Sequence, residues 1–323
     1  SAIVITIILQ TLFFTVGMQH NKKIINFSAM TVYTGMLIFF FVVLLSDVKI
    51  TTEAFSNIFN LNNFLDVNNL APLLTVAGTI FAYFSILIIS FGDFSRYVKN
   101  EQELKKGNLS LILNLIIFSF LSVFIVTGSD VFLNQKFSDI DRIFTNPTDI
   151  IGKFDNIQIT IVVLFFIIIA SASTNLVANF IPSQYSLINF APSILSLKSA
   201  SYLIAFFGLL IAIFWLTILS QIGILSFVDT FGAFFGPLFG VMAADYYLIK
   251  NQELSNKDLY SIDKESAYYY SGGWHIKGVY SLILGFIFSA STIWNTNLMF
   301  LQSYAWIIGA FVAWITYYLL AKK

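Results

Sequence analysis

Apolar runs of about 20 residues recur along the whole chain, and this repetition constrains the fold more than any other feature. Only 11% of the residues are charged, 58% are hydrophobic, and the mean hydropathy is +0.82. A soluble domain of this size needs far more charge on its surface. We therefore predict an all-α, polytopic membrane protein, because helices satisfy their backbone hydrogen bonds internally inside a bilayer.

The hydropathy pattern predicts nine membrane helices and also their orientation. The predicted helices cover residues 2–18, 27–46, 71–94, 109–128, 157–180, 200–219, 222–249, 278–294 and 302–321. Of the 17 Lys and Arg residues, 13 fall in the loops on the side that follows the first helix. The long loops 47–70 and 129–156 on the other side are acidic. By the positive-inside rule, the basic side and the C-terminus are cytoplasmic.

The remaining composition argues against several function classes. The net charge is zero, so nothing indicates nucleic acid as a partner. The chain has no Cys, which excludes thiolate catalysis and Cys-based metal sites within it. His20 and His275 fall in predicted cytoplasmic loops, where we expect solvated side chains. No metalloprotease, nucleophile-elbow or phosphate-loop motif occurs. We predict that the protein is not an enzyme; the composition leaves the oligomeric state open.

An uncharged polar run closes the fifth apolar segment, from Ala170 to Asn179. On a helix, Asn175 and Asn179 share a face, with Ser171 one turn earlier. One interpretation is packing, because small and hydroxyl residues are common where membrane helices touch. The other is a neutral polar site for a small cation or for an uncharged, hydrogen-bonding solute. The run alone leaves both open.

Two other helices carry features with two interpretations each. In the helix at 71–94, Gly78 precedes Phe84, which indicates either ordinary packing or a broken helix with an aromatic wall for a flat heterocycle. In the helix at 222–249, a glycine stripe with Pro237 indicates either close packing or a moving gate. The stripe consists of Gly232, Gly236 and Gly240. Asp229 on that helix is either an interfacial acid or a gating or proton-linked group.

Three motifs resemble the nucleobase:cation symporter-1 family. Residues 91–97, FGDFSRY, resemble the end of its sixth helix, and residues 173–179, STNLVAN, resemble its eighth. Residues 234–247, FFGPLFGVMAADYY, resemble its tenth helix and the loop that follows. Their order and spacing also fit the family. The resemblance covers the chain as one transmembrane domain, residues 1–323.

The resemblance implies a leucine-transporter-like fold of twelve helices, built from two inverted five-helix repeats and two further helices. Nine of the twelve are expected here. Because the chain opens at Ser1 directly in an apolar run, we interpret it as truncated at the N-terminus, without helices one to three. The implied function is import of uracil, cytosine, purines, allantoin or hydantoins across the inner (plasma) membrane by symport with sodium or protons.

The resemblance also implies site residues. The family's cation site falls on Ala170, Ser173 and Thr174, which we predict to bind Na⁺. The substrate amide contact falls on Asn179, and Phe84 stands where a hydantoin-transporting member has tryptophan. This departure keeps an aromatic face but loses the indole donor. We add Gly78 and Asn175 to the predicted substrate site.

Elementary chemistry agrees with this assignment. Hydroxyl and carbonyl oxygens suit a sodium ion, and a carboxamide donates and accepts at once, matching the ring amide of a pyrimidine or hydantoin. A neutral site leaves no unpaired charge beside a neutral solute. Two competitors stay open at this point: an amino-acid/cation symporter of similar fold, and a membrane sensor that does not transport.

Overall fold

The computed structural model is built from helices throughout the residues that it describes. The described residues are 4, 7, 8, 11, 12, 18–46, 48–60, 66–136, 147–153, 156–214, 224–259, 261 and 263–322. Within them, eight helices are long and apolar enough to cross a membrane. These eight confirm the second to ninth predicted helices. The first predicted helix, 2–18, lies outside the described residues except for a few positions.

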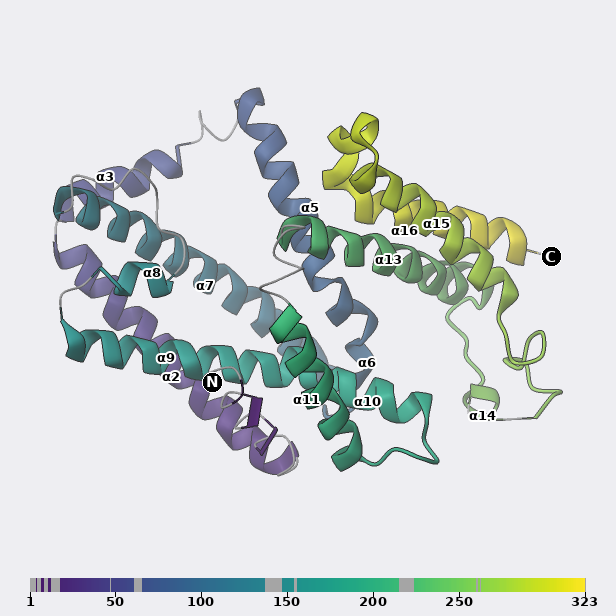
Figure 1. Cartoon of the computed structure of the whole chain (residues 1–323). Helices are drawn as coiled ribbons and strands as arrows, with labels where there is room; N and C mark the ends of the chain where they lie inside the picture. The colour runs from purple at the N-terminus through teal and green to yellow at the C-terminus, as the bar shows by residue number, and fades with distance from the viewer. Residues whose placement is uncertain are drawn as a thin grey trace. The chain divides into compact units, whose positions relative to one another are not determined.

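The chain divides into two compact units (Figure 1). Unit 1 comprises residues Ser1–Leu65 and Asp93–Ala212, and unit 2 comprises Asp66–Gly92 and Ile213–Lys323. The helices of unit 1 include α2 (Met18–Ser46), α3 (Val48–Ile58), α7 (Glu101–Lys136), α8 (Pro147–Ile151), α9 (Ile157–Asn175), η1 (Leu176–Phe180), α10 (Ile181–Phe190) and most of α11 (Leu197–Phe214). Unit 2 includes α5 (Val67–Ile89), α13 (Ile224–Ala244), η3 (Asp245–Ile249), α14 (Asn256–Leu259), α15 (Ile276–Trp294), η4 (Thr296–Tyr304) and α16 (Ala305–Ala321). The short helix α6 (Phe91–Ser95) spans the boundary between the units.

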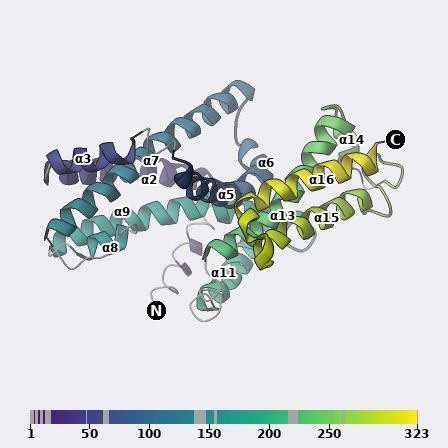
Figure 2. The same cartoon turned by 90° about the horizontal axis from the view of Figure 1, so that it is seen from above.

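In unit 1, α2 packs against both α7 and α9 (Figure 2). A glycine permits the approach to α9, since a Cβ atom on Gly35 would lie 2.9 Å from the ring of Phe166. On the α7 side, the Tyr33 hydroxyl donates to Oδ1 of Asn114 over 2.8 Å. Because membrane helices gain little from apolar burial against one another, close approach and side-chain hydrogen bonds hold such a pair together.

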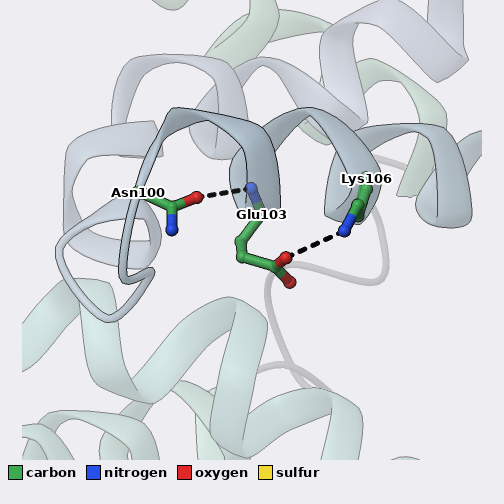
Figure 3. Close-up of polar contacts among 3 residues, drawn as sticks. All are labelled: Asn100, Glu103 and Lys106. Carbon is green, nitrogen blue, oxygen red and sulfur yellow. Dashed lines mark hydrogen bonds and ion pairs between the residues drawn. The ribbon is translucent and has the colours of Figure 1, made fainter.

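The start of α7 lies before the predicted boundary at residue 109, because polar side chains satisfy its first turn. Oδ1 of Asn100 accepts from the Glu103 backbone N–H over 2.9 Å, which is an N-cap interaction (Figure 3). The Glu103 carboxylate then pairs with Lys106 Nζ at 3.0 Å. This charged first turn extends the helix beyond its apolar stretch.

The fifth predicted helix, 157–180, does not end at residue 180. The helix continues through Pro182 into α10, after five residues of π-helix, Leu176–Phe180. A proline lacks the N–H for an ordinary helical bond and crowds the carbonyl four residues earlier. In the π turn, the Ile181 N–H reaches the Leu176 carbonyl instead. Such wide turns occur mostly as single insertions within helices, often at functional sites.

In unit 2, α13 packs against α5, α15 and α16, and Figure 1 shows α13, α15 and α16 side by side. The glycine stripe makes these contacts possible. A Cβ on Gly232 would lie 2.4 Å from the Ala82 side chain, and one on Gly240 would lie 2.1 Å from the Ala310 carbonyl oxygen. The structure therefore supports the packing interpretation of the stripe.

The helix around Gly78 differs from the predicted one. Asp66 caps α5 by accepting from the Asn68 N–H over 2.9 Å, so the helix begins before residue 71 and ends at Ile89 instead of residue 94. The helix is continuous through Gly78, so the broken-helix interpretation is wrong. A Cβ there would lie 2.0 Å from the backbone oxygen of Ser303, so Gly78 permits a close contact with η4.

Candidate functional site

The three predicted cation ligands lie together on the last turns of α9. The Ser173 hydroxyl donates to the Ala170 carbonyl over 3.0 Å. Ser173 and Ala170 are half-buried, whereas Thr174 is exposed. A serine hydroxyl that donates its hydrogen still has lone pairs directed elsewhere. Ala170, Ser173 and Thr174 thus offer neutral oxygens within about one helical turn.

Asn175 and Asn179 form a carboxamide pair across the start of the π turn. The Asn179 side-chain amide donates to Oδ1 of Asn175 over 2.8 Å. This bond orients the Asn179 carboxamide. Its carbonyl oxygen and second N–H have no hydrogen-bond partner in the part of the chain that the structure describes. The Asn179 side chain therefore retains one acceptor and one donor.

A cavity of about 170 Å³ lies next to this pair, within unit 1. The described residues that line it are all uncharged and come from three parts of the chain. They are Ile7, Thr11, Asn175, Asn179, Phe180, Ser183, Ile204, Ala205 and Gly208. A mostly apolar lining with a few convergent polar groups is the usual composition of a small-molecule site, although about 170 Å³ is below the roughly 300–1,000 Å³ of such sites.

Sequence reasoning missed the two hydroxyl residues of this cavity. Thr11 and Ser183 each donate to the carbonyl four residues earlier, Ile7 and Asn179, over 2.7 Å in both cases. The signal was present for Ser183, which lies four residues after Asn179 on the same helix face. The sequence analysis did not single out Thr11, which lies in the first apolar run, far along the chain from Asn179.

The other two predicted substrate residues belong to unit 2. Phe84 is half-buried on α5, and its ring lies edge-on to that of Tyr83 with the centroids 5.3 Å apart. Gly78 contacts Ser303, as described above. Neither residue lines the cavity of unit 1. The structure therefore brings together Asn175 and Asn179 beside the predicted cation ligands, and places Phe84 and Gly78 on a separate element.

Comparison with known proteins gives the family. The family of permeases for cytosine and purines, uracil, thiamine and allantoin matches residues 1–309. The chain belongs to this family. The allantoin permease of Bacillus subtilis (strain 168) is 28% identical over 244 residues, which are 75% of this chain and 48% of that protein. The purine-uracil permease of Arabidopsis thaliana is 25% identical over 255 residues, 75% of this chain and 41% of that protein. The chain thus spans about half the length of these curated relatives.

Solved structures agree with the predicted fold class. The inward-facing conformation of Mhp1 aligns with 98% of this chain and 65% of its own, with a TM-score of 0.63 and 18% sequence identity. A closed conformation of Mhp1, described as a nucleobase-cation-symport-1 family transporter with bromovinylhydantoin bound, gives a TM-score of 0.53 at 18% identity. This likeness confirms the all-α, multi-pass membrane fold of the leucine-transporter type.

In this family member, the FGDFSRY motif builds a cluster with α10 inside unit 1. Arg96 pairs with Asp93 at 3.5 Å, and its guanidinium carbon lies 4.4 Å from the centroid of the Tyr185 ring. The hydroxyls of Tyr97 and Tyr185 are hydrogen-bonded. Burial, reinforced by that bond, raises the pKa of Tyr97 to about 12. The tyrosine is therefore neutral at physiological pH and remains a hydrogen-bond donor or acceptor.

The third motif ends in a second cluster, in unit 2, which corrects the prediction for His275. The Tyr317 hydroxyl donates to Oδ1 of Asp245 over 2.6 Å and lies 3.2 Å from Nε2 of His275. The imidazole stacks on Tyr270 with the ring centroids 3.9 Å apart. His275 is thus a half-buried contact residue rather than a solvated one, and burial lowers its pKa. The side chain of His20 lies outside the described residues.

Proposed function

We propose that the full-length protein is a secondary transporter for a nucleobase-like heterocycle, driven by cation symport through alternating access. The observation that carries the proposal is the oriented Asn179 carboxamide beside an uncharged cavity. A donor and an acceptor on one carboxamide complement the N–H and C=O of a ring amide, such as those of uracil, cytosine, allantoin or hydantoin. The absence of charge among the lining residues suits a neutral solute.

The same helix supplies the proposed cation site. We assign Na⁺ to the oxygens of Ala170, Ser173 and Thr174, with a proton as the alternative coupling ion. Hydroxyl and carbonyl oxygens are ligands for hard cations, and none of these three residues adds a charge of its own. Coupling follows from proximity, because the cation residues and Asn179 share one continuous helical segment.

Phe84 and Gly78 are retained as proposed substrate residues on the resemblance alone, with the Phe84 ring offering an aromatic face for stacking. We assign residues 1–323 to a single transmembrane domain in the inner (plasma) membrane, and the distribution of Lys and Arg supports a cytoplasmic C-terminus.

The test is uptake by purified full-length protein in lipid vesicles. We expect accumulation of at least one radiolabelled heterocycle among uracil, cytosine, allantoin and hydantoin when a sodium or proton gradient is imposed. Asn179→Ala should abolish binding and uptake, because the donor and the acceptor are lost together. Asn189→Ala is the matched control, since Asn189 is exposed on α10 and does not line the cavity. If the wild-type protein accumulates none of these compounds, the proposed function is wrong.

A further inference from the structure

Unit 2 contains a buried carboxyl group that the proposed function does not use. Asp229 lies on α13, within the candidate membrane span Phe227–Ile249, and only 8% of its surface is exposed. Nε2 of Gln302 donates to Oδ2 of Asp229 over 2.8 Å. Thr79 supplies a second side-chain hydrogen bond. The carboxyl group thus connects three elements of unit 2, namely α13, η4 and α5.

Both hydrogen-bond partners of Asp229 are neutral. The ion pairs among the described residues, Arg96–Asp93, Lys105–Glu101 and Lys106–Glu103, do not include it. The sequence of α13 contains no other titratable side chain. A carboxylate here would carry an uncompensated negative charge as far as the described residues show.

The titratable groups on the elements packed against α13 do not supply a counter-charge either. α5 carries Tyr83 and η4 carries Tyr304, and both hydroxyls are uncharged when protonated. The others lie on η3, α15 and α16: Asp245, Tyr246, Tyr247, Lys277, Tyr280, Tyr317 and Tyr318. Lys277 is the basic group in that set. Its charge lies close enough to His275, in the Asp245 cluster, to act electrostatically on that imidazole. Asp245 is about 24 Å from Asp229 along the helix, at 1.5 Å per residue.

An uncompensated buried carboxylate is costly, and such a group avoids the cost by taking up a proton. The neighbours suit both protonation states. Gln302 and Thr79 each combine a donor with an acceptor, so they can donate to a carboxylate or accept from a carboxyl O–H after a side-chain rotation. Protonation therefore reverses one of the two hydrogen bonds, while the other neighbour still donates to the remaining carboxyl oxygen.

We propose that Asp229 is a proton-binding site that loads and releases a proton during the transport cycle. Its chemistry is the equilibrium between a carboxylate plus H⁺ from water and a neutral carboxyl group, with no other bond made or broken. The part of the proposal that concerns the cycle rests on the proposed function. The part that concerns proton binding does not, since it needs only the folded protein in a membrane.

The occupancy of the site is tested by infrared spectroscopy of the full-length protein in lipid vesicles, titrated with pH. A protonated, buried carboxyl group gives a C=O stretching band separate from that of ionised carboxylates. We expect this band in the wild type and in the exposed-loop control Glu253→Gln, and its loss in Asp229→Asn. If the wild type shows no such band at any pH at which it is folded, Asp229 is permanently ionised and the proposal is wrong.

A second variant keeps the test decisive if Asp229→Asn does not fold. Gln302→Met removes a donor to the carboxylate, so the protonated form should persist to higher pH, by about one pH unit for a lost hydrogen bond to a charged group. If the pH at which the C=O band is half-lost is the same in Gln302→Met as in the wild type, the band belongs to another carboxyl group. The proposal is then overturned.

Coupling is tested separately, by uptake driven by a pH gradient alone. Asp229→Asn should still bind the heterocycle at equilibrium, because Asp229 does not line the proposed site, but should lose at least about tenfold in accumulation. Equal accumulation by the variant and the wild type would show that the bound proton is not transported. If the wild type transports under a sodium gradient but not under a pH gradient, the proton does not drive transport, and the part of the proposal that concerns the cycle is overturned. If it transports under neither gradient, the proposed function fails, whereas the infrared result still decides proton binding.

Discussion

At the residue scale, His275 shows how packing sets a protonation state outside the membrane spans. Burial lowers its pKa, and the nearby Asp245 carboxylate only partly opposes this shift. In the unfolded chain the imidazole takes up a proton near its ordinary pKa of about 6.5. The unfolded state therefore binds more protons than the folded state over the range just below that value. The stability that His275 contributes is full above this range and falls as the pH drops through it.

We accordingly expect acid to loosen the segment from residue 263 to residue 275. Backbone amide exchange in this segment should accelerate as the pH is lowered from about 7.5 to about 5.5, after correction for the intrinsic pH dependence of exchange. His275→Gln keeps hydrogen-bonding groups but does not titrate, so its corrected exchange should stay level over the same range. Equal acceleration in the two proteins would assign the effect to another group.

The proposed cation site gives a second prediction for a single residue. Thr174→Val removes one hydroxyl ligand and keeps the shape of the side chain. We expect the sodium concentration for half-maximal uptake to rise about tenfold, the effect of losing about 1.4 kcal/mol of binding. Thr160→Val on the same helix is the control. Thr160 lies more than three turns from Thr174, and its hydroxyl donates to the Asn156 carbonyl. A shift of the same size in both variants would contradict the assignment.

The residues of the candidate site were predictable only in part. Asn175 and Asn179 share a helix face at a spacing of four, and the structure joins them by a hydrogen bond. Thr11, however, precedes Asn179 by more than 160 positions, and no periodicity links positions so far apart. The same holds for Gln302, which reaches Asp229 from 73 residues away. Local spacing predicts neighbours on one helix, whereas contacts between helices require the packed structure.

At the element scale, the glycine stripe of α13 fixes how closely the helices of unit 2 approach. We expect Gly240→Ala to destabilise the protein by roughly 1–3 kcal/mol, because the new methyl group would lie 2.1 Å from the Ala310 carbonyl oxygen and α16 would have to move. Thermal unfolding in detergent measures this loss.

The control for that substitution is Gly107→Ala on α7, where a Cβ would meet nothing within 4 Å. Alanine favours helix over glycine by roughly 0.5–1 kcal/mol, so this variant should be unchanged or slightly more stable. A similar loss of stability in both variants would mean that the contact between α13 and α16 does not explain the result.

Helices were predictable at this scale, but their ends and irregularities were not. Apolar length located eight spans, because a bilayer imposes that length. The ends of α7 and α5 depend on polar caps, Asn100 and Asp66, which lie outside the apolar runs. The fifth predicted helix ended at residue 180, yet a π turn lets the helix continue through Pro182. Hydropathy carries no information on such hydrogen-bond rearrangements.

At the scale of the whole molecule, the charge distribution predicts which loops face the cytoplasm. Lys250, Lys257 and Lys264 lie in the segment between η3 and α15, whereas the predicted outer loop 47–70 contains α3 and acidic residues. Basic loops stay inside during insertion, and acidic residues contribute little to this choice. The prediction is therefore that residue 265 is cytoplasmic and residue 53 is external.

Single cysteines test this orientation directly, because the chain contains no cysteine of its own. In the full-length protein, with any cysteine elsewhere replaced by serine, we would introduce Glu265→Cys or Glu53→Cys; both glutamates are exposed. A maleimide that does not cross membranes should label the thiol at position 53 in intact cells and the thiol at position 265 only after permeabilisation. The reverse pattern would invert the topology. The cytoplasmic placement of the His275 cluster would then be wrong, and the pH that acts on it would be that of the external medium.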